Sequence, residues 1–178
     1  DSIAKPLHSL GKLETLLIQI AGITGNAEVD LSRRGLIAMC ADNGVVEEGV
    51  TQTGQEVTAI VAENFLKYDT SVGVMCKQNH AEIFPVDMGM VTDTKVRTDH
   101  KIAYGTQNMT KGPAMTREQA VKGLEAGIDM VRELNDKGYR ILATGEMGIG
   151  NTTTSSAVAS VLLKQPVEEM TGRGAGLT

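Results

Sequence analysis

The 178-residue sequence is short of aromatic side chains, with no tryptophan, two phenylalanines and three tyrosines. Base stacking on aromatic side chains therefore cannot be its main means of holding single-stranded nucleic acid. Positive charge is short as well, because 17 lysines and arginines against 22 aspartates and glutamates leave a net charge of -5. Duplex binding normally needs lysines and arginines gathered on one face. Both shortages argue against nucleic acid as a partner.

Cysteine and histidine are also scarce. Cys40 and Cys76 lie among apolar residues without Cys-x-x-Cys spacing, which is typical of small buried side chains in a reducing compartment. No two of His8, His80 and His100 have the spacing of metal ligands. No apolar run approaches the ~20 residues of a membrane helix, and the first residues lack the apolar core of a secretory signal. We predict a cytoplasmic protein with no membrane partner, metal site or other cofactor.

Glycine, by contrast, is abundant, and many of the 20 glycines follow short apolar runs. Such runs predict buried strands at residues 35–41, 81–86 and 139–144. Pro85 is expected at the end of the second strand, because proline cannot donate to a sheet ladder. Apolar spacing of three or four predicts helices over residues 7–21, 55–66, 72–78, 116–138, 151–163 and 166–170. The fourth helix should begin with a capping box of Thr116 and Gln119.

Strands that alternate with helices of this length favour parallel pairing through right-handed crossovers. We predict an α/β fold, a Rossmann-like open parallel sheet with flanking helices, over residues 31–178, preceded by a helical segment over residues 1–30. Three strands are visible, whereas such sheets commonly have about 5 to 6. The chain also stops in a glycine-rich turn, so we expect the core to be truncated at its C-terminal end.

Each predicted strand is followed by an acid two residues before a glycine, namely Asp42, Asp87 and Glu146. Ligands of an open α/β sheet bind beyond the carboxyl ends of the strands, so we expect these acids to converge on one mouth. The alternative is that each acid caps the helix or turn that follows it.

The strongest of the three positions is the segment GEMGIGNTTT at residues 145–154, between an apolar strand and a helix. Free backbone N–H groups and the helix dipole favour phosphate at such a place. The segment is neither a P-loop nor a GxGxxG turn. By itself it predicts an anion site, with a tight turn that holds no ligand as the alternative.

Several motifs together resemble one known family. They are ADNGVVEEGVT at residues 41–51, QEVTAIVAENFL at 55–66, VDMG at 86–89, PAMTREQA at 113–120 and GEMGIGNTTT at 145–154. The opening AKPLHSLGKLE and the closing GRGAGL fit as well, so the resemblance covers essentially the whole chain. The sequence is similar to the nicotinate-nucleotide–dimethylbenzimidazole phosphoribosyltransferases.

The resemblance implies an enzyme, a pentosyltransferase. Ribose 5-phosphate would pass from nicotinate mononucleotide to 5,6-dimethylbenzimidazole or a related base, which releases nicotinate. The product, α-ribazole 5'-phosphate, supplies the lower ligand of cobalamin and related cobamides. The resemblance also implies small-molecule substrates, a homodimer, and a smaller domain to which residues 1–30 belong.

By resemblance, Glu146 is an active-site glutamate that faces the transferred ribose and the bases. The turns at residues 145–152 and 172–176 suit the donor phosphate, and residues 51–61 resemble the wall of the base pocket. Some members have a polar residue where this chain has Val61. The expected substrate-binding residues are Asp42, Thr53, Val61, Asp87, Gly145, Gly148, Gly150, Asn151, Thr152, Gly174 and Gly176.

Family members are about twice as long, and their general base, a glutamate that deprotonates the benzimidazole, lies in the part that this chain lacks. No residue here is given that role. The isolated chain is therefore expected to be inactive or nearly so.

Three other functions stay open. The first is a related phosphoribosyltransferase for phenolic or purine-like bases. The second is a half-length nucleotide-binding subunit whose companion chain supplies the base. The third, and the least favoured, is a magnesium-dependent enzyme with Asp42, Asp87 and Glu146 as ligands.

Overall fold

The computed structural model describes residues 4–174. Internal contacts divide the chain into two units, Asp1–Ser32 and Arg33–Thr178. The first unit holds helix α1 (Lys12–Thr24), none of whose residues is buried. The helix begins later than predicted because Gly11 (φ 55°, ψ -128°) has a non-helical backbone, and it passes Gly22 to end at Gly25 in the left-handed region.

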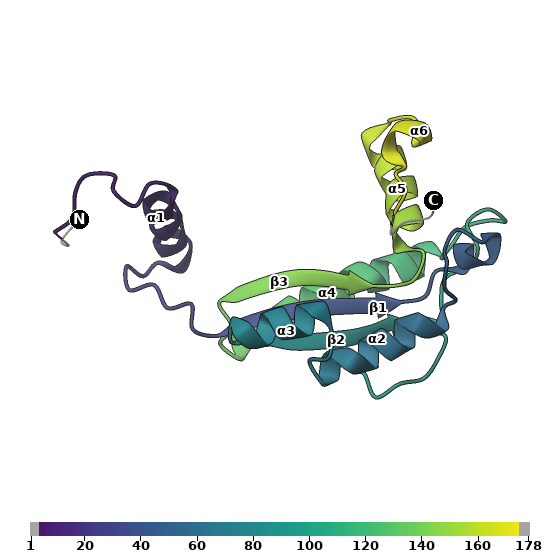
Figure 1. Cartoon of the computed structure of the whole chain (residues 1–178), viewed down its shortest axis with the longest axis horizontal. Coiled ribbons are helices and arrows are strands. Elements are labelled where there is room, and N and C mark those ends of the chain that lie inside the picture. The colour runs from purple at the N-terminus through teal and green to yellow at the C-terminus, as the bar shows by residue number, and fades with distance from the viewer. Residues whose placement is uncertain (1–3, 175–178) are drawn as a thin grey trace. The chain divides into compact units, whose positions relative to one another are not determined.

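The second unit is built on a parallel sheet with the strand order β2-β1-β3, which confirms the predicted α/β fold (Figure 1). The strands are β1 (Arg34–Ala41), β2 (Ala81–Gly89) and β3 (Ile141–Met147). Every residue of central β1 is buried or half-buried, and the neighbours Ile37 and Ala38, on opposite faces of the sheet, are both buried. Its run of apolar side chains therefore serves both faces of the sheet.

The expectation that Pro85 ends β2 is wrong, since the strand continues to Gly89. β2 is an edge strand of this sheet, and every second amide along it points away from β1. Ile83 N donates to Tyr68 Oη (3.4 Å) and Asp87 N donates to the Arg97 carbonyl (2.8 Å), both on that outer side. Pro85 lies midway between Ile83 and Asp87, so its nitrogen also faces away from β1. Its missing N–H therefore costs no hydrogen bond to β1.

β3 also runs further than predicted, from Ile141 to Met147 instead of over residues 139–144. Its pairing with β1 continues in register, with Gly145 opposite Ala38 and Met147 opposite Cys40. The first residues of the predicted glycine-rich turn therefore belong to the strand.

Helices cover both faces of the sheet. Helices α2 (Glu56–Leu66) and α3 (Ser71–Gln78) lie on one face, where Ala38 and Cys40 pack with Ala59, Ala62 and Phe65. Helix α4 (Arg117–Asp136) lies on the other, where Ile37 and Val86 pack with Met130, Leu134 and Tyr139. Two apolar cores, one on each face, thus hold the sheet in place.

The predicted start and end of α4 are confirmed. Thr116 Oγ1 accepts from Gln119 N (3.1 Å), and Gln119 Oε1 accepts from Thr116 N (2.8 Å), which is the capping box. Gly138 closes the helix with φ 88°. The remaining elements are the 3₁₀ helix η1 (Gly44–Glu48), α5 (Asn151–Leu163) and α6 (Val167–Met170). Within residues 4–174, no helix combines the length and apolarity needed to span a bilayer.

Candidate active site

Three residues, Gly148 to Gly150, connect β3 to α5, and we call them the 148–150 turn. A Cβ on Gly148 would lie 2.3 Å from the Ala41 carbonyl oxygen, so the turn packs against the end of β1. Gly150 has φ 84°, a left-handed conformation in which a side chain is strained. Both glycines are therefore needed for the tight approach of the turn to β1.

Helix α5 begins at Asn151 without a side-chain cap. Thr153 N and Thr154 N donate to the Gly150 carbonyl at 3.1 Å and 3.3 Å. Asn151 N also donates to the Gly148 carbonyl (2.9 Å), so an anion here would meet Thr152 N and the positive end of the helix dipole. The start of α5 is thus suited to an anion.

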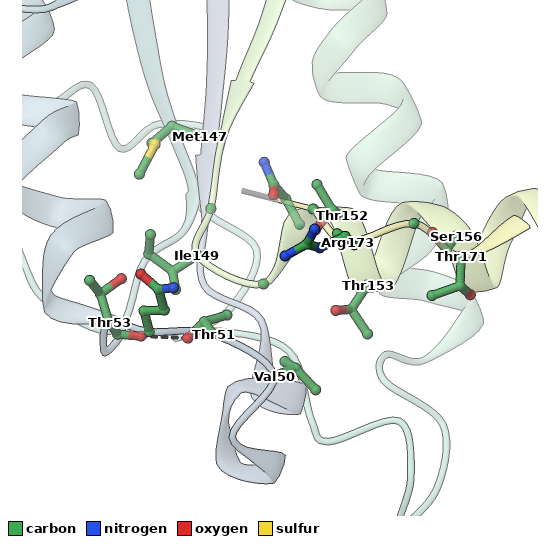
Figure 2. A pocket seen from close by; sticks show the side chains of 16 residues that line it. Val50, Thr51, Thr53, Met147, Ile149, Thr152, Thr153, Ser156, Thr171 and Arg173 are labelled. Carbon is green, nitrogen blue, oxygen red and sulfur yellow. Dashed lines mark hydrogen bonds between the residues drawn. The ribbon is translucent and has the colours of Figure 1, made fainter. Parts of the chain in front are cut away.

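A pocket of about 800 Å³ opens in front of this helix end (Figure 2). That volume suits a ligand of nucleotide size. One wall is the segment 50–53, and the opposite wall runs from Met147 to Thr153 with Ser156. Residues 171–174 close the pocket. Hydroxyl groups line it on every side, from Thr51, Thr53, Thr152, Thr153, Ser156 and Thr171.

Arg173 also lines the pocket, and the sequence reasoning missed it by assigning only the glycines around it. Gly174 lies so close to α5 that a Cβ there would be 2.9 Å from Thr152 Oγ1. A guanidinium beside a helix N-terminus is a fitting partner for a phosphate. The signal was present in the sequence, as an arginine between two glycines.

Many of the predicted substrate-binding residues line this pocket, namely Thr53, Gly148, Gly150, Asn151, Thr152 and Gly174. Gly145 lies within β3, and Val61 packs against the apolar core under α2. Gly176 lies outside the described residues. The two glycine-rich segments thus meet at Thr152, although they are far apart in sequence.

Glu146 is exposed, next to the pocket-lining residue Met147. The Asn151 side-chain amide donates a hydrogen bond to Glu146 Oε1. Because Gly150 caps α5 without any side-chain bond, Glu146 does not cap this helix. Its carboxylate is held by the first residue of α5 and is open to solvent.

Asp42 and Asp87 have different surroundings, being 1% and 0% exposed. Asp87 Oδ1 accepts from Gly89 N (2.9 Å) and Met90 N (2.7 Å), and its Oδ2 lies 3.1 Å from Lys101 Nζ. Asp42 Oδ2 accepts from Val91 N (2.7 Å). Both acids thus bind the loop that follows β2, residues 89–106, and neither lines the pocket.

The three acids do share one end of the sheet, around Cys40. Burial raises the pKa of the Cys40 thiol to about 12, and the negative charges of Asp87, Glu146 and Asp42 add to the shift. A thiol with so high a pKa stays protonated at neutral pH and is no nucleophile. Within residues 4–174, no three His, Cys, Asp or Glu side chains are placed together as metal ligands.

Comparison with known proteins identifies the family of this chain. The family model described as phosphoribosyltransferase matches residues 1–178. The nicotinate-nucleotide–dimethylbenzimidazole phosphoribosyltransferases of Ruminiclostridium cellulolyticum and Clostridium tetani are 51% and 48% identical over 180 residues. These alignments cover 100% of this chain but 51% and 50% of the relatives, so the chain spans about half their length.

A solved structure gives the same result for the fold. The crystal structure of CobT from Thermus thermophilus is similar with a TM-score of 0.89 at 36% sequence identity. The similarity covers 100% of this chain and 54% of that one.

Proposed function

This chain belongs to the phosphoribosyltransferase family, and on that premise we propose that its pocket binds nicotinate mononucleotide as a phosphoribosyl donor. The ribose 5-phosphate would pass to 5,6-dimethylbenzimidazole or a related base, giving nicotinate and α-ribazole 5'-phosphate for the cobalamin lower ligand. One observation carries the proposal: the 148–150 turn, the start of α5 and Arg173 line one cavity. A phosphate monoester complements all three at once.

The donor's phosphate is placed at the start of α5, beside Thr152 and Arg173. In the transfer, the bond from ribose C1' to the nicotinate nitrogen breaks and its electron pair stays on nicotinate. A new bond joins C1' to a ring nitrogen of the acceptor base, which loses its proton. Positive charge builds up on the ribose meanwhile, and the Glu146 carboxylate, held by Asn151, stabilises it.

The acceptor base is placed against residues 50–53, which we call the acceptor wall, and against Ile149. This side of the pocket offers threonine hydroxyls and aliphatic carbon, which suits a flat heterocycle. Val61 lies behind it in the core, and Asp42, Asp87 and Gly145 would act on substrates only through the backbone that they support.

The proton of the acceptor base needs a general base, which we place in polypeptide outside these 178 residues. Exposed side chains support a further partner for this region. Ile141 in β3 is 39% exposed, and α5 exposes the apolar residues Val158, Val161, Leu162 and Leu163. The partner polypeptide is a continuation of the same chain or a companion subunit. The whole protein is proposed to be a cytoplasmic homodimer.

Two measurements test the proposal. Calorimetric titration of the chain should show binding of nicotinate mononucleotide and much weaker binding of nicotinate riboside, which lacks the phosphate. Equal affinity for the two ligands would contradict the phosphate site.

The second measurement is transfer of the ribose, followed by chromatography. A chimaera would join residues 1–178 to the remaining half of the Ruminiclostridium cellulolyticum relative. It should form α-ribazole 5'-phosphate from dimethylbenzimidazole, whereas the 178-residue chain alone should not. Comparable rates for both proteins would place the general base inside this chain, and a panel of phenolic and purine bases identifies the preferred acceptor.

A further inference from the structure

The central residue of the 148–150 turn, Ile149, is held on both sides by side chains from other elements. Thr58 Oγ1 in α2 accepts from Ile149 N (3.1 Å), and Asn43 Nδ2 donates to the Ile149 carbonyl (3.0 Å). Thr58 is fully buried. Because the Ile149 carbonyl shares its peptide plane with Gly150 N–H, these two bonds fix both peptide planes of the turn.

Asn43 reaches beyond the turn. Its Oδ1 accepts from Thr154 Oγ1 (2.9 Å) in the first turn of α5. Its backbone carbonyl accepts from Gln55 Nε2 (3.0 Å), just after the acceptor wall. Asn43, two residues beyond β1, therefore links the pocket-lining Ile149 to the first turn of α5 and to Gln55, two residues after the acceptor wall.

The start of α5 depends on these contacts for its orientation. Gly150 gives the helix no side-chain cap, so the Asn43 and Thr58 contacts, together with backbone bonds, help to fix where its first amides point. Electrostatic binding of an anion depends on donors that are already aimed at it. A small rotation of the Ile149 peptides would change the direction in which α5 begins.

We propose that Asn43 and Thr58 are positioning residues: Thr58, by holding Ile149 N–H, fixes the turn that presents the start of α5 to the donor phosphate, and Asn43 in addition sets the spacing of the donor and acceptor sides. This inference rests on the proposed function. It predicts that loss of Thr58's acceptor weakens the donor alone, whereas loss of the Asn43 side chain weakens donor and acceptor base together.

The test uses the chimaera, with KM measured separately for nicotinate mononucleotide and for dimethylbenzimidazole. Thr58→Val keeps the shape but removes the acceptor, and it should raise the KM for the donor about tenfold while the KM for the base changes little. Thr58→Ser should restore the donor KM. Asn43→Leu should raise both KM values.

Thr70→Val is the matched control, because Thr70 Oγ1 accepts from Gly73 N (3.0 Å) at the start of α3 and does not line the pocket. It should lower the unfolding temperature and leave both KM values unchanged. Unchanged donor KM in Thr58→Val, or an equal rise in Thr70→Val, would overturn the inference.

If Thr58→Val does not fold, Asn43→Leu and Thr58→Ser still test the inference through the pattern of the two KM values. The failures are distinguishable as well. Phosphate-independent binding by the unsubstituted protein contradicts the proposed function, whereas phosphate-dependent binding with unchanged variants contradicts only the positioning roles.

Discussion

The two edge strands carry the same sequence pattern, an acid two residues before a glycine, yet the acids differ in surroundings. Asp87 of β2 is fully buried and binds the backbone of the loop that follows, whereas Glu146 of β3 is exposed beside the pocket. The connections explain the difference. Residues 89–106 fold back onto β2, with Ile102 N bonded to the Met88 carbonyl (3.0 Å), but the 148–150 turn leads directly into α5. Equal motifs can thus give one buried acid that supports a loop and one exposed acid that we propose to act on the ribose.

Glu146→Gln tests the exposed acid and has the largest expected effect. In the chimaera it should lower turnover by about 10²- to 10³-fold, because the charge that stabilises the ribose is lost, while the unfolding temperature hardly changes. The control is Glu125→Gln on the exposed surface of α4. Near-normal turnover in Glu146→Gln would remove this residue from the mechanism.

Asp87→Asn tests the buried acid. Loss of the buried charge beside Lys101 should lower the free energy of unfolding by about 3 kcal/mol in a urea titration. Asp93→Asn is a matched control, since Asp93 Oδ1 lies 3.2 Å from the same Lys101 Nζ but its side chain is 78% exposed. The control should change stability by less than ~1 kcal/mol. Full stability with lost turnover in Asp87→Asn would make Asp87 a substrate residue and break the comparison.

Gly148→Ala and Gly145→Ala test whether the turn, and not the end of strand β3, needs glycine. The first should cost about 2 kcal/mol and weaken donor binding, because its Cβ would overlap the Ala41 carbonyl. In the second, the Cβ would lie 3.5 Å from Leu36 Cδ2, an ordinary contact, so little change is expected. Thermal unfolding and calorimetry of both variants give the comparison. Strongly reduced donor binding in Gly145→Ala would show direct contact with the substrate.

Arg173→Ala has the smallest expected effect. It should weaken nicotinate mononucleotide about tenfold and leave nicotinate riboside unchanged, because only the phosphate needs the guanidinium. Arg132→Ala on α4, with its side chain 75% exposed, is the control. An equal loss for both ligands would mean that Arg173 acts on the fold instead of the phosphate.

The structure corrects the sequence predictions at positions whose conformation depends on contacts with segments distant in sequence. Nothing near Pro85 reveals that β2 lies at an edge of this sheet, and the extension of β3 through Glu146 depends on its pairing with Met39. Likewise, the sequence shows Arg173 between two glycines, but the approach of residue 174 to Thr152 is what brings this arginine into the pocket.

The sequence by itself determined the features that depend on residues close together in the chain. Unbroken apolar runs produce the strands, apolar residues spaced by three or four produce the helices, Thr116 with Gln119 starts α4, and the glycine-rich turn after β3 leads into α5. Only the tertiary structure decided which acid is buried and which is exposed, and that Asn43 and Thr58 hold Ile149. The physical reason is that a side chain's burial and partners come from segments far away in sequence, where no local pattern records them.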